Sequence, residues 1–241
     1  MSDEGTPSTN NGRGELLARL NERVASGEAT TGARAELAQA TRVIIDELMR
    51  STASDEGFVR AAELVTAAVG LLRGESHGRG YVGVAEGSLA DGGNHFLDYS
   101  PFIGLLNPLA PPLTVHYADD KTVVATGTYG AAYEGPPGCL HGGYIAAGFD
   151  EVLGFAQGYA GLQGMTGRLE ISYRSPTPLF REVRFVARMD RVEGRKIFTS
   201  ATLSDGDRLC AEAQGLFISM KPEVFGRLMG MRASAEPPRP D

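Results

Sequence analysis

The stretch "GCLHGGYIAAGFDEVLGF", residues 138–155, decides the fold of this chain. A histidine and two glycines open it, and small and apolar residues follow at the spacing of a helix. Two acids, Asp150 and Glu151, interrupt the apolar run. Small residues at successive positions let a β-sheet approach a helix closely on several sides. We therefore expect one central apolar helix with a sheet wrapped around it.

Segments with strand character lie on both sides of this helix in the sequence. They are "LTVHY" (113–117), "TVVATGTYG" (122–130), "MTGRLEISYRS" (165–175), "EVRFVARMDRV" (182–192), "KIFTSATLS" (196–204) and "RLCAEAQGLFISM" (208–220). The dipeptides Glu193-Gly194 and Asp205-Gly206 join the last three, and such pairs are typical of tight hairpins. The fold class is therefore predicted to be α+β, with an antiparallel sheet around one helix.

The region 15–73 is predicted to be helical. Its clearest apolar stripe, at helical spacing, consists of Phe58, Ala61, Ala62, Val65, Ala68, Val69 and Leu72. Ser54, followed by Asp55 and Glu56, predicts a capped and acidic N-terminus for that helix. An earlier helix is expected near 34–50, and its apolar residues are Leu37, Val43, Ile44 and Leu48. A helix-turn-helix DNA reader is the alternative interpretation, and the acidic balance of the chain argues against it.

Changes in composition divide the chain into four parts. Residues 1–14 and 226–241 are polar or proline-rich without periodicity, so we expect disordered tails. Residues 15–94 form a predicted helical extension that ends in a Gly-rich linker. Residues 95–225 form the predicted domain of sheet and central helix.

The composition also excludes several classes of protein. A chain that is 42% hydrophobic and 22% charged is typical of soluble globular proteins, and its net charge of −7 argues against nucleic-acid binding. No secretory signal is visible and no apolar run is long enough to cross a bilayer, so we expect a cytoplasmic protein without membrane insertion. Cys139 and Cys210 are too few for a disulfide framework, and the histidine spacing indicates no metal site.

The start of the central helix has the chemistry of an oxyanion hole. Free N–H groups at a helix N-terminus can polarise a carbonyl oxygen, and Gly142 would let a ligand come close to them. A carboxylate in an apolar setting, such as Asp150, can act as general base or nucleophile. The two residues are eight positions apart, or about 12 Å along one helix, so a shared site needs two antiparallel helices from two chains. The plainer interpretation is a glycine turn and a solvated carboxylate.

Four segments carry a resemblance to a known family. They are "NPLAPPL" (107–113), "HGGYIAAGFDEVLG" (141–154), "MTGRLEISYRSPTPL" (165–179) and "VEGRK" (192–196). An acid follows the histidine by nine residues and a threonine follows the acid by sixteen. This pattern, over residues 107–220, resembles the hotdog-fold acyl-CoA thioesterases of the PaaI-like and thioesterase-superfamily-member type. The resemblance implies a hotdog fold, with the N-terminal helices as an extension that the family does not explain.

The resemblance also implies roles for individual residues. Asp150 would be the general base or nucleophile, Gly142 the oxyanion donor, and His141 would orient the thioester. Thr166 would position Asp150 or the attacking water, although its plain alternative is an ordinary strand threonine. Glu151 is interpreted as a surface or interface charge. The residues expected to bind substrate or coenzyme A are Gly143, Asn107, Ser172, Arg174, Arg195 and Lys196. For the last two, an ordinary charged hairpin turn is the plainer interpretation.

The resemblance implies hydrolysis of a medium- or long-chain fatty acyl-CoA to free acid and CoA, in fatty acid metabolism. No separate cofactor is expected, because coenzyme A is part of the substrate. The expected partner is a second copy of the chain in a homodimer with shared active sites, and a dimer of dimers is the alternative. Two other functions stay open: a non-catalytic acyl-CoA binder or sensor, and a hotdog 3-hydroxyacyl thioester dehydratase.

Overall fold

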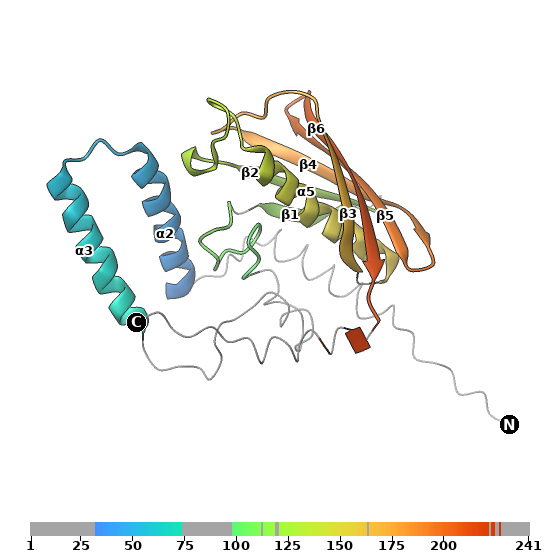
Figure 1. Cartoon of the computed structure of the whole chain (residues 1–241), viewed down its shortest axis with the longest axis horizontal. Helices are drawn as coiled ribbons and strands as arrows, with labels where there is room; N and C mark the ends of the chain where they lie inside the picture. The colour runs from blue at the N-terminus through green and yellow to red at the C-terminus, as the bar shows by residue number, and fades with distance from the viewer. Residues whose placement is uncertain are drawn as a thin grey trace.

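The computed structural model describes residues 32–73, 98–111, 113–118, 121–162, 164–221, 223–224 and 227. The predicted N-terminal tail, the first part of the helical region and the Gly-rich linker lie outside these residues. The predicted C-terminal tail does so too, apart from one residue. Within the described residues, a body of sheet and helix is accompanied by two N-terminal helices (Figure 1).

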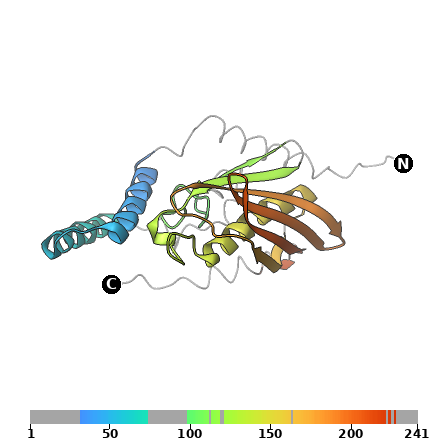
Figure 2. The ribbon, with the colours of Figure 1, turned by 90° about the horizontal axis from the view of Figure 1, so that it is seen from above.

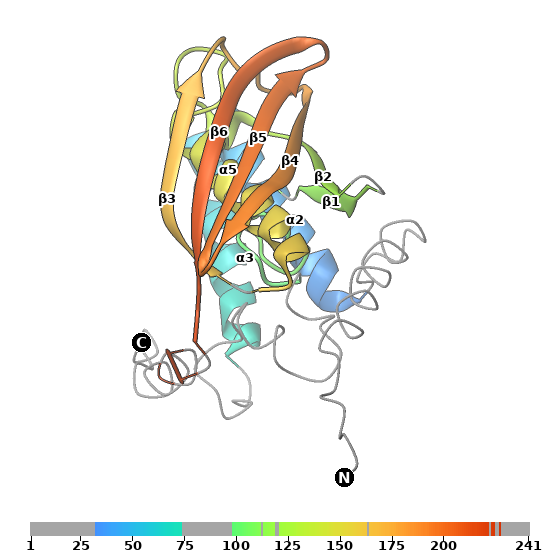
Figure 3. The ribbon, with the colours of Figure 1, turned by 90° about the vertical axis from the view of Figure 1, so that its right-hand side faces the viewer.

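The body contains a sheet of six strands in the order β1-β2-β4-β5-β6-β3, and every neighbouring pair is antiparallel. The strands are β1 (Thr114–Tyr117), β2 (Thr122–Thr128), β3 (Gly164–Tyr173), β4 (Glu182–Glu193), β5 (Lys196–Asp205) and β6 (Arg208–Ser219). The sheet curves around one helix, α5 (Gly142–Ala156), which lies behind it in Figure 3. This arrangement confirms the predicted α+β hotdog fold, and it leaves β3 at an edge of the sheet.

Small residues allow α5 to lie close to the sheet. A Cβ added to Gly148 would lie only 2.7 Å from Cζ of Phe185 on β4. The rings of Phe149 and Phe185 meet edge to face at 5.3 Å, and both side chains are fully buried. Val152 and Leu153 complete the buried face of the helix. The hydrophobic core of the body therefore lies between α5 and the concave face of the sheet.

Both predicted hairpins form. Their two-residue loops are Gly194-Arg195 and Gly206-Asp207, so each loop begins one position later than the dipeptides Glu193-Gly194 and Asp205-Gly206. Glu193 pairs with Lys196 and Asp205 pairs with Arg208, so Gly194 and Gly206 each take the first position of a two-residue loop. Both have a φ of 58°, in the left-handed region that a side chain would disfavour. This is the glycine position of a type II′ turn.

The two N-terminal helices differ in how they meet the body. Arg42 of α2 (Ala33–Arg50) donates hydrogen bonds to four main-chain carbonyls, those of Gly104, Leu105, Asn107 and Ala110. Asp46 of α2 accepts a hydrogen bond from the N–H of Ala131, at the start of the short helix η1 (Ala131–Tyr133). These contacts fix α2 to the body through the loop 98–111 and η1.

The second helix, α3 (Asp55–Leu72), extends away from the body in both Figure 1 and Figure 2. Its N-cap is Ser54, whose Oγ accepts from the N–H of Gly57, as the sequence predicts. All of its residues are exposed except Ala68, which is half-buried. Neither this helix nor any other described one has the length and apolar character needed to cross a membrane.

Candidate active site

The first turn of α5 leaves one main-chain donor unused. The imidazole of His141 caps the helix, because its Nδ1 accepts from the N–H of Gly143 at 3.0 Å. The N–H groups of Tyr144 and Ile145 both donate to the carbonyl of His141. Within the described part of the chain, the N–H of Gly142 has no acceptor. Of the two glycines that open α5, Gly142 therefore offers a free N–H, whereas the N–H of Gly143 is already occupied.

The position of His141 is fixed by the preceding loop. Its main-chain N–H donates to the carbonyl of Tyr133 at 2.9 Å. Gly135 packs directly beneath it, since a Cβ at that position would lie 2.8 Å from Cα of His141. A neutral imidazole that accepts at Nδ1 carries its proton on Nε2. The exposed ring of His141 can therefore offer an N–H to a ligand at the start of α5.

Tyr173, at the end of β3, belongs to the same cluster. Its hydroxyl donates to the carbonyl of Gly142 at 2.9 Å. Because side chains alternate along a strand, Tyr173 shares a face with Leu169 and Ile171, and both of these pack against the core. The sequence did not predict the contact of Tyr173 with the helix start, because that contact joins residues 31 positions apart.

At the other end of β3, Thr166 meets the carboxylate of Asp150. The hydroxyl of Thr166 donates to Oδ1 of Asp150 at 2.7 Å, and the carboxylate is exposed. A β-bulge lies between Thr166 and Arg168. Because side chains alternate along a strand, the extra residue, Gly167, turns Thr166 toward the helix side that Leu169 also faces. The bulge therefore explains how the predicted spacing becomes a contact.

Glu151 is half-buried, so it is not the exposed surface charge that was one of the two expectations, and the other expectation, an interface charge, stays a prediction. Oε1 of Glu151 accepts a hydrogen bond from the hydroxyl of Ser100 at 2.6 Å. Burial raises the pKa of this carboxyl, the nearby charge of Asp150 adds to the rise, and the hydrogen bond from Ser100 opposes it. The contact holds the loop 98–111 against α5, one residue from the candidate catalytic acid.

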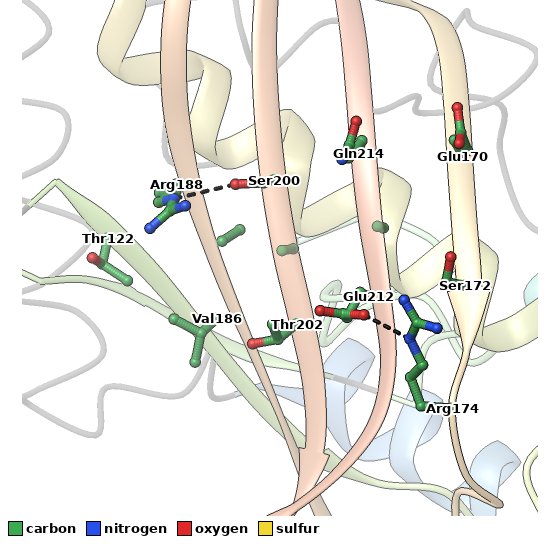
Figure 4. A pocket seen from close by; sticks show the side chains of 13 residues that line it. Thr122, Glu170, Ser172, Arg174, Val186, Arg188, Ser200, Thr202, Glu212 and Gln214 are labelled. Carbon is green, nitrogen blue, oxygen red and sulfur yellow. Dashed lines mark hydrogen bonds and ion pairs between the residues drawn. The ribbon is translucent and has the colours of Figure 1, made fainter.

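The residues expected to bind coenzyme A do not form one cluster. Ser172 and Arg174 lie on the outer face of the sheet, in a hollow of about 480 Å³ (Figure 4). Nε of Arg174 is 2.7 Å from Oε2 of Glu212 in an exposed ion pair. The sheet separates this hollow from α5, so these two side chains do not meet Asp150 within one chain.

The remaining predicted residues lie at two other places. Arg195 and Lys196 are in the β4–β5 hairpin, where the guanidinium of Arg195 donates twice to the carbonyl of Ser219. Ser219 pairs with Gly164, so this hairpin lies toward the end of the sheet where β3 begins. Asn107 uses both ends of its side-chain amide inside the loop 98–111, and its role in binding stays a prediction.

The candidate catalytic residues thus form two groups, which we call half-sites, at opposite ends of the pair formed by α5 and β3. His141, Gly142 and Tyr173 form one end, and Asp150 and Thr166 form the other. About 12 Å of helix separates the free N–H from the carboxylate, since α5 rises about 1.5 Å per residue. A reacting carbonyl must lie about 3 Å from both groups. The half-sites of one chain therefore cannot act on one carbonyl together.

The region that holds both half-sites is similar to known thioesterases. The family model described as "Thioesterase superfamily" matches residues 137–212, which include α5, β3 and the two half-sites. Acyl-coenzyme A thioesterase THEM4 of Bos taurus is 39% identical over 107 residues, and that of Xenopus laevis is 39% identical over 95 residues. The bovine match covers 44% of each chain, so the chain spans less than half the length of this curated relative.

A solved structure extends the likeness beyond the body. The crystal structure of a thioesterase superfamily protein is 31% identical, with a TM-score of 0.68. The match covers 78% of this chain and 95% of that one. The body makes up only about half of the chain, so the likeness must extend into the N-terminal region.

Proposed function

The chain belongs to the thioesterase superfamily, and we propose that it hydrolyses acyl-CoA thioesters to free acid and CoA. One observation carries the proposal: the exposed carboxylate of Asp150, on a mostly apolar helix, is oriented by the hydroxyl of Thr166 at 2.7 Å. A fixed carboxylate open to solvent has the geometry of a general base or nucleophile. The names of the THEM4 relatives support the same activity.

In the proposed reaction, the N–H of Gly142 stabilises the oxyanion that develops on the thioester carbonyl. Asp150 takes a proton from the attacking water, or attacks the carbonyl itself to form an anhydride that water then opens. In both routes the bond from the carbonyl carbon to sulfur breaks and the thiolate of CoA leaves. The proton that the water gives up through Asp150 then ends on that thiolate. The Nε2–H of His141 orients the thioester beside Gly142. Thr166 holds the carboxylate in place throughout.

We propose that the site is completed by a second copy of the chain. α5 and β3 run antiparallel to one another, because Tyr173 meets Gly142 and Thr166 meets Asp150. A twofold axis beside the middle of this pair would bring the Gly142 end of one copy to the Asp150 end of the other. β3 is an edge strand in the described sheet, which leaves that side of the body open to a partner.

We propose medium- or long-chain fatty acyl-CoA as the substrate class. The loop 98–111 supports this, because Ser100 ties its apolar residues to α5 beside Asp150. Phe102 and Ile103 of this loop already pack on the core. The basic side chains of Arg174, Arg195 and Lys196 are suited to the phosphates of coenzyme A. Arg174 and Ser172 could serve a site built from two copies, since they lie on the edge strand or next to its end.

The test is release of free thiol from a panel of acyl-CoAs, from acetyl to stearoyl, with phenylacetyl and benzoyl thioesters added. We expect turnover to increase with chain length, and Asp150→Asn to reduce it by about a hundredfold or more. The matched control is Glu182→Gln, which neutralises an exposed carboxylate at the start of β4, outside both half-sites. This control should keep the wild-type rate.

Two results would contradict the proposal and favour another function. Tight binding of acyl-CoA without thiol release, by a folded protein, would indicate a binder or sensor. Hydration of crotonyl-CoA without hydrolysis would indicate a dehydratase or hydratase. Undiminished hydrolysis by Asp150→Asn would remove that residue from the mechanism.

A further inference from the structure

Within the described residues, no segment covers the apolar stripe of α3, and only Ala68 in it is half-buried. Its seven residues are Phe58, Ala61, Ala62, Val65, Ala68, Val69 and Leu72. Val65 and Val69 are each 43% exposed and Leu72 is 65% exposed. Burying an aliphatic or aromatic side chain of this size is worth roughly 1.5–3 kcal/mol. A helix that leaves such a stripe in water is expected to pack against another surface.

The stripe is symmetric about its central residue. Counted from Val65, its members lie at three, four and seven positions on either side. If two such helices pair antiparallel about a twofold axis at Val65, each Val65 meets its own copy. Phe58 then lies opposite Leu72, Ala61 lies opposite Val69, and Ala62 lies opposite Ala68. The large residues meet near the ends, while the alanines beside the centre let the two helices approach closely.

The charges of α3 favour the same arrangement. Asp55 begins the helix and Arg73 is its C-cap. They are 18 positions apart, which is five turns, so they lie on the same line along the helix. In an antiparallel pair, Asp55 of one copy lies beside Arg73 of the other. The helix dipoles also oppose one another favourably, whereas a parallel pair would bring like ends together.

Other occupants fit the helix less well. A helix that lies on an anionic membrane is rich in lysine and arginine on its polar face. The polar residues of α3 are instead mostly acidic: Asp55, Glu56 and Glu63 outnumber Arg60. Arg60 and Glu63 are also joined in an ion pair on the exposed side. The same acidic balance opposes nucleic acid.

We infer that α3 is a self-association surface, and that it pairs antiparallel with α3 of a second copy of this chain about a twofold axis at Val65. The pair joins copies through the N-terminal extension, separately from the edge strand β3. It does not depend on the proposed thioesterase activity, because no residue of α3 belongs to either half-site.

Disulfide trapping tests this geometry directly. Val65→Cys, Phe58→Cys and Leu71→Cys are each made with Cys139→Ser, because Cys139 is the less buried native cysteine. Val65→Cys should give a covalent dimer under mild oxidation, since the two sulfurs meet at the axis. Phe58→Cys should not, because its copy lies about 21 Å away along an antiparallel pair. Leu71→Cys should not either, because Leu71 is 85% exposed and lies outside the stripe.

Two further variants measure the strength of the association by sedimentation. Val65→Glu places two like charges at the axis and should weaken the association through α3 about a hundredfold or more, while the pairing proposed at β3 is kept. The matched Leu71→Glu should leave it unchanged. Equal trapping of the Val65, Phe58 and Leu71 cysteines would overturn the inference. So would equal masses for the two glutamate variants, or binding of the wild type to phosphatidylserine vesicles that Val65→Glu abolishes.

Discussion

Large apolar side chains are buried in the body of the chain, whereas on the helix α3 they are exposed. In the body, Phe149 and Phe185 are completely buried between α5 and the sheet. In α3, Phe58 is 36% exposed, and the other members of its stripe are exposed as well, apart from the half-buried Ala68. An apolar stripe needs a partner surface, and within the described residues the body supplies its own. The difference suggests that apolar surfaces of the body are covered within one chain, whereas the stripe of α3 is covered by a second copy.

The largest expected effect is on the buried interface between α5 and the sheet. Phe185→Ala should lower the free energy of unfolding by about 3–5 kcal/mol, because it leaves a cavity under α5. Phe58→Ala, the same change in α3, should cost less than about 1 kcal/mol at concentrations where the protein is monomeric. Urea denaturation followed by circular dichroism measures both. Equal losses would contradict the contrast between the two regions.

The next largest effect is expected where α2 contacts the loop 98–111. Arg42→Ala leaves four carbonyls of the loop 98–111 without their charged donor, and should destabilise the docking of α2 by about 1.5–3 kcal/mol. Hydrogen exchange should speed up in α2 while β4 and β5 stay protected. Arg60→Ala removes an exposed ion pair with Glu63 on α3 and serves as the control, with an effect below about 0.5 kcal/mol.

The next prediction concerns Thr166 on the edge strand β3, where its hydroxyl contacts Asp150. Thr166→Ala removes the hydrogen bond to Asp150 and should lower kcat/KM for acyl-CoA about tenfold, or roughly 1.4 kcal/mol. Thr166→Ser keeps the hydroxyl and should retain most of the activity. If Thr166→Ala were as active as the wild type, the hydrogen bond would have no part in positioning the carboxylate.

The smallest effect concerns the pH dependence of stability. Burial raises the pKa of Glu151 above its ordinary value of 4.5, so its ionisation favours the unfolded chain. As pH rises above about 4.5, the native state of the wild type should lose this part of its stability. Glu151→Gln cannot ionise and still accepts from Ser100, so its stability relative to the wild type should rise over that range. Urea titrations at pH 4, 5, 6 and 7 measure the difference, and a constant difference would contradict the assignment.

Local patterns in the sequence predicted most of the fold. The strands and α5 follow from alternation and helical spacing, and Ser54 caps α3 because that interaction spans only a few residues. The contact between Thr166 and Asp150 was predicted through the family pattern, although its physical basis is a bulge at Gly167.

Other parts of the site could not be predicted, because they depend on tertiary packing. The rotamer of His141 decides that the N–H of Gly143 is already occupied. Ser100 and Glu151 are 51 positions apart, and no local pattern joins them. The loop around Asn107 takes its shape from Arg42 of α2, which is also distant in sequence.

The central claim is that each active site combines Gly142 of one copy with Asp150 of another. Gly142→Pro removes the N–H at the first position of α5, where proline fits a helix, and the extended His141 before it is compatible with proline. Gly142→Ala keeps the N–H and should remain active. Gly142→Pro and Asp150→Asn should each be inactive alone.

The decisive measurement is thiol release after these two inactive variants are unfolded together and refolded as a mixture. In mixed dimers, the intact Gly142 of one copy meets the intact Asp150 of the other, so about a quarter of all sites should be complete. The account therefore predicts recovery of about a quarter of the wild-type activity. A mixture that stays as inactive as its components, although both variants refold and associate, would contradict the shared site.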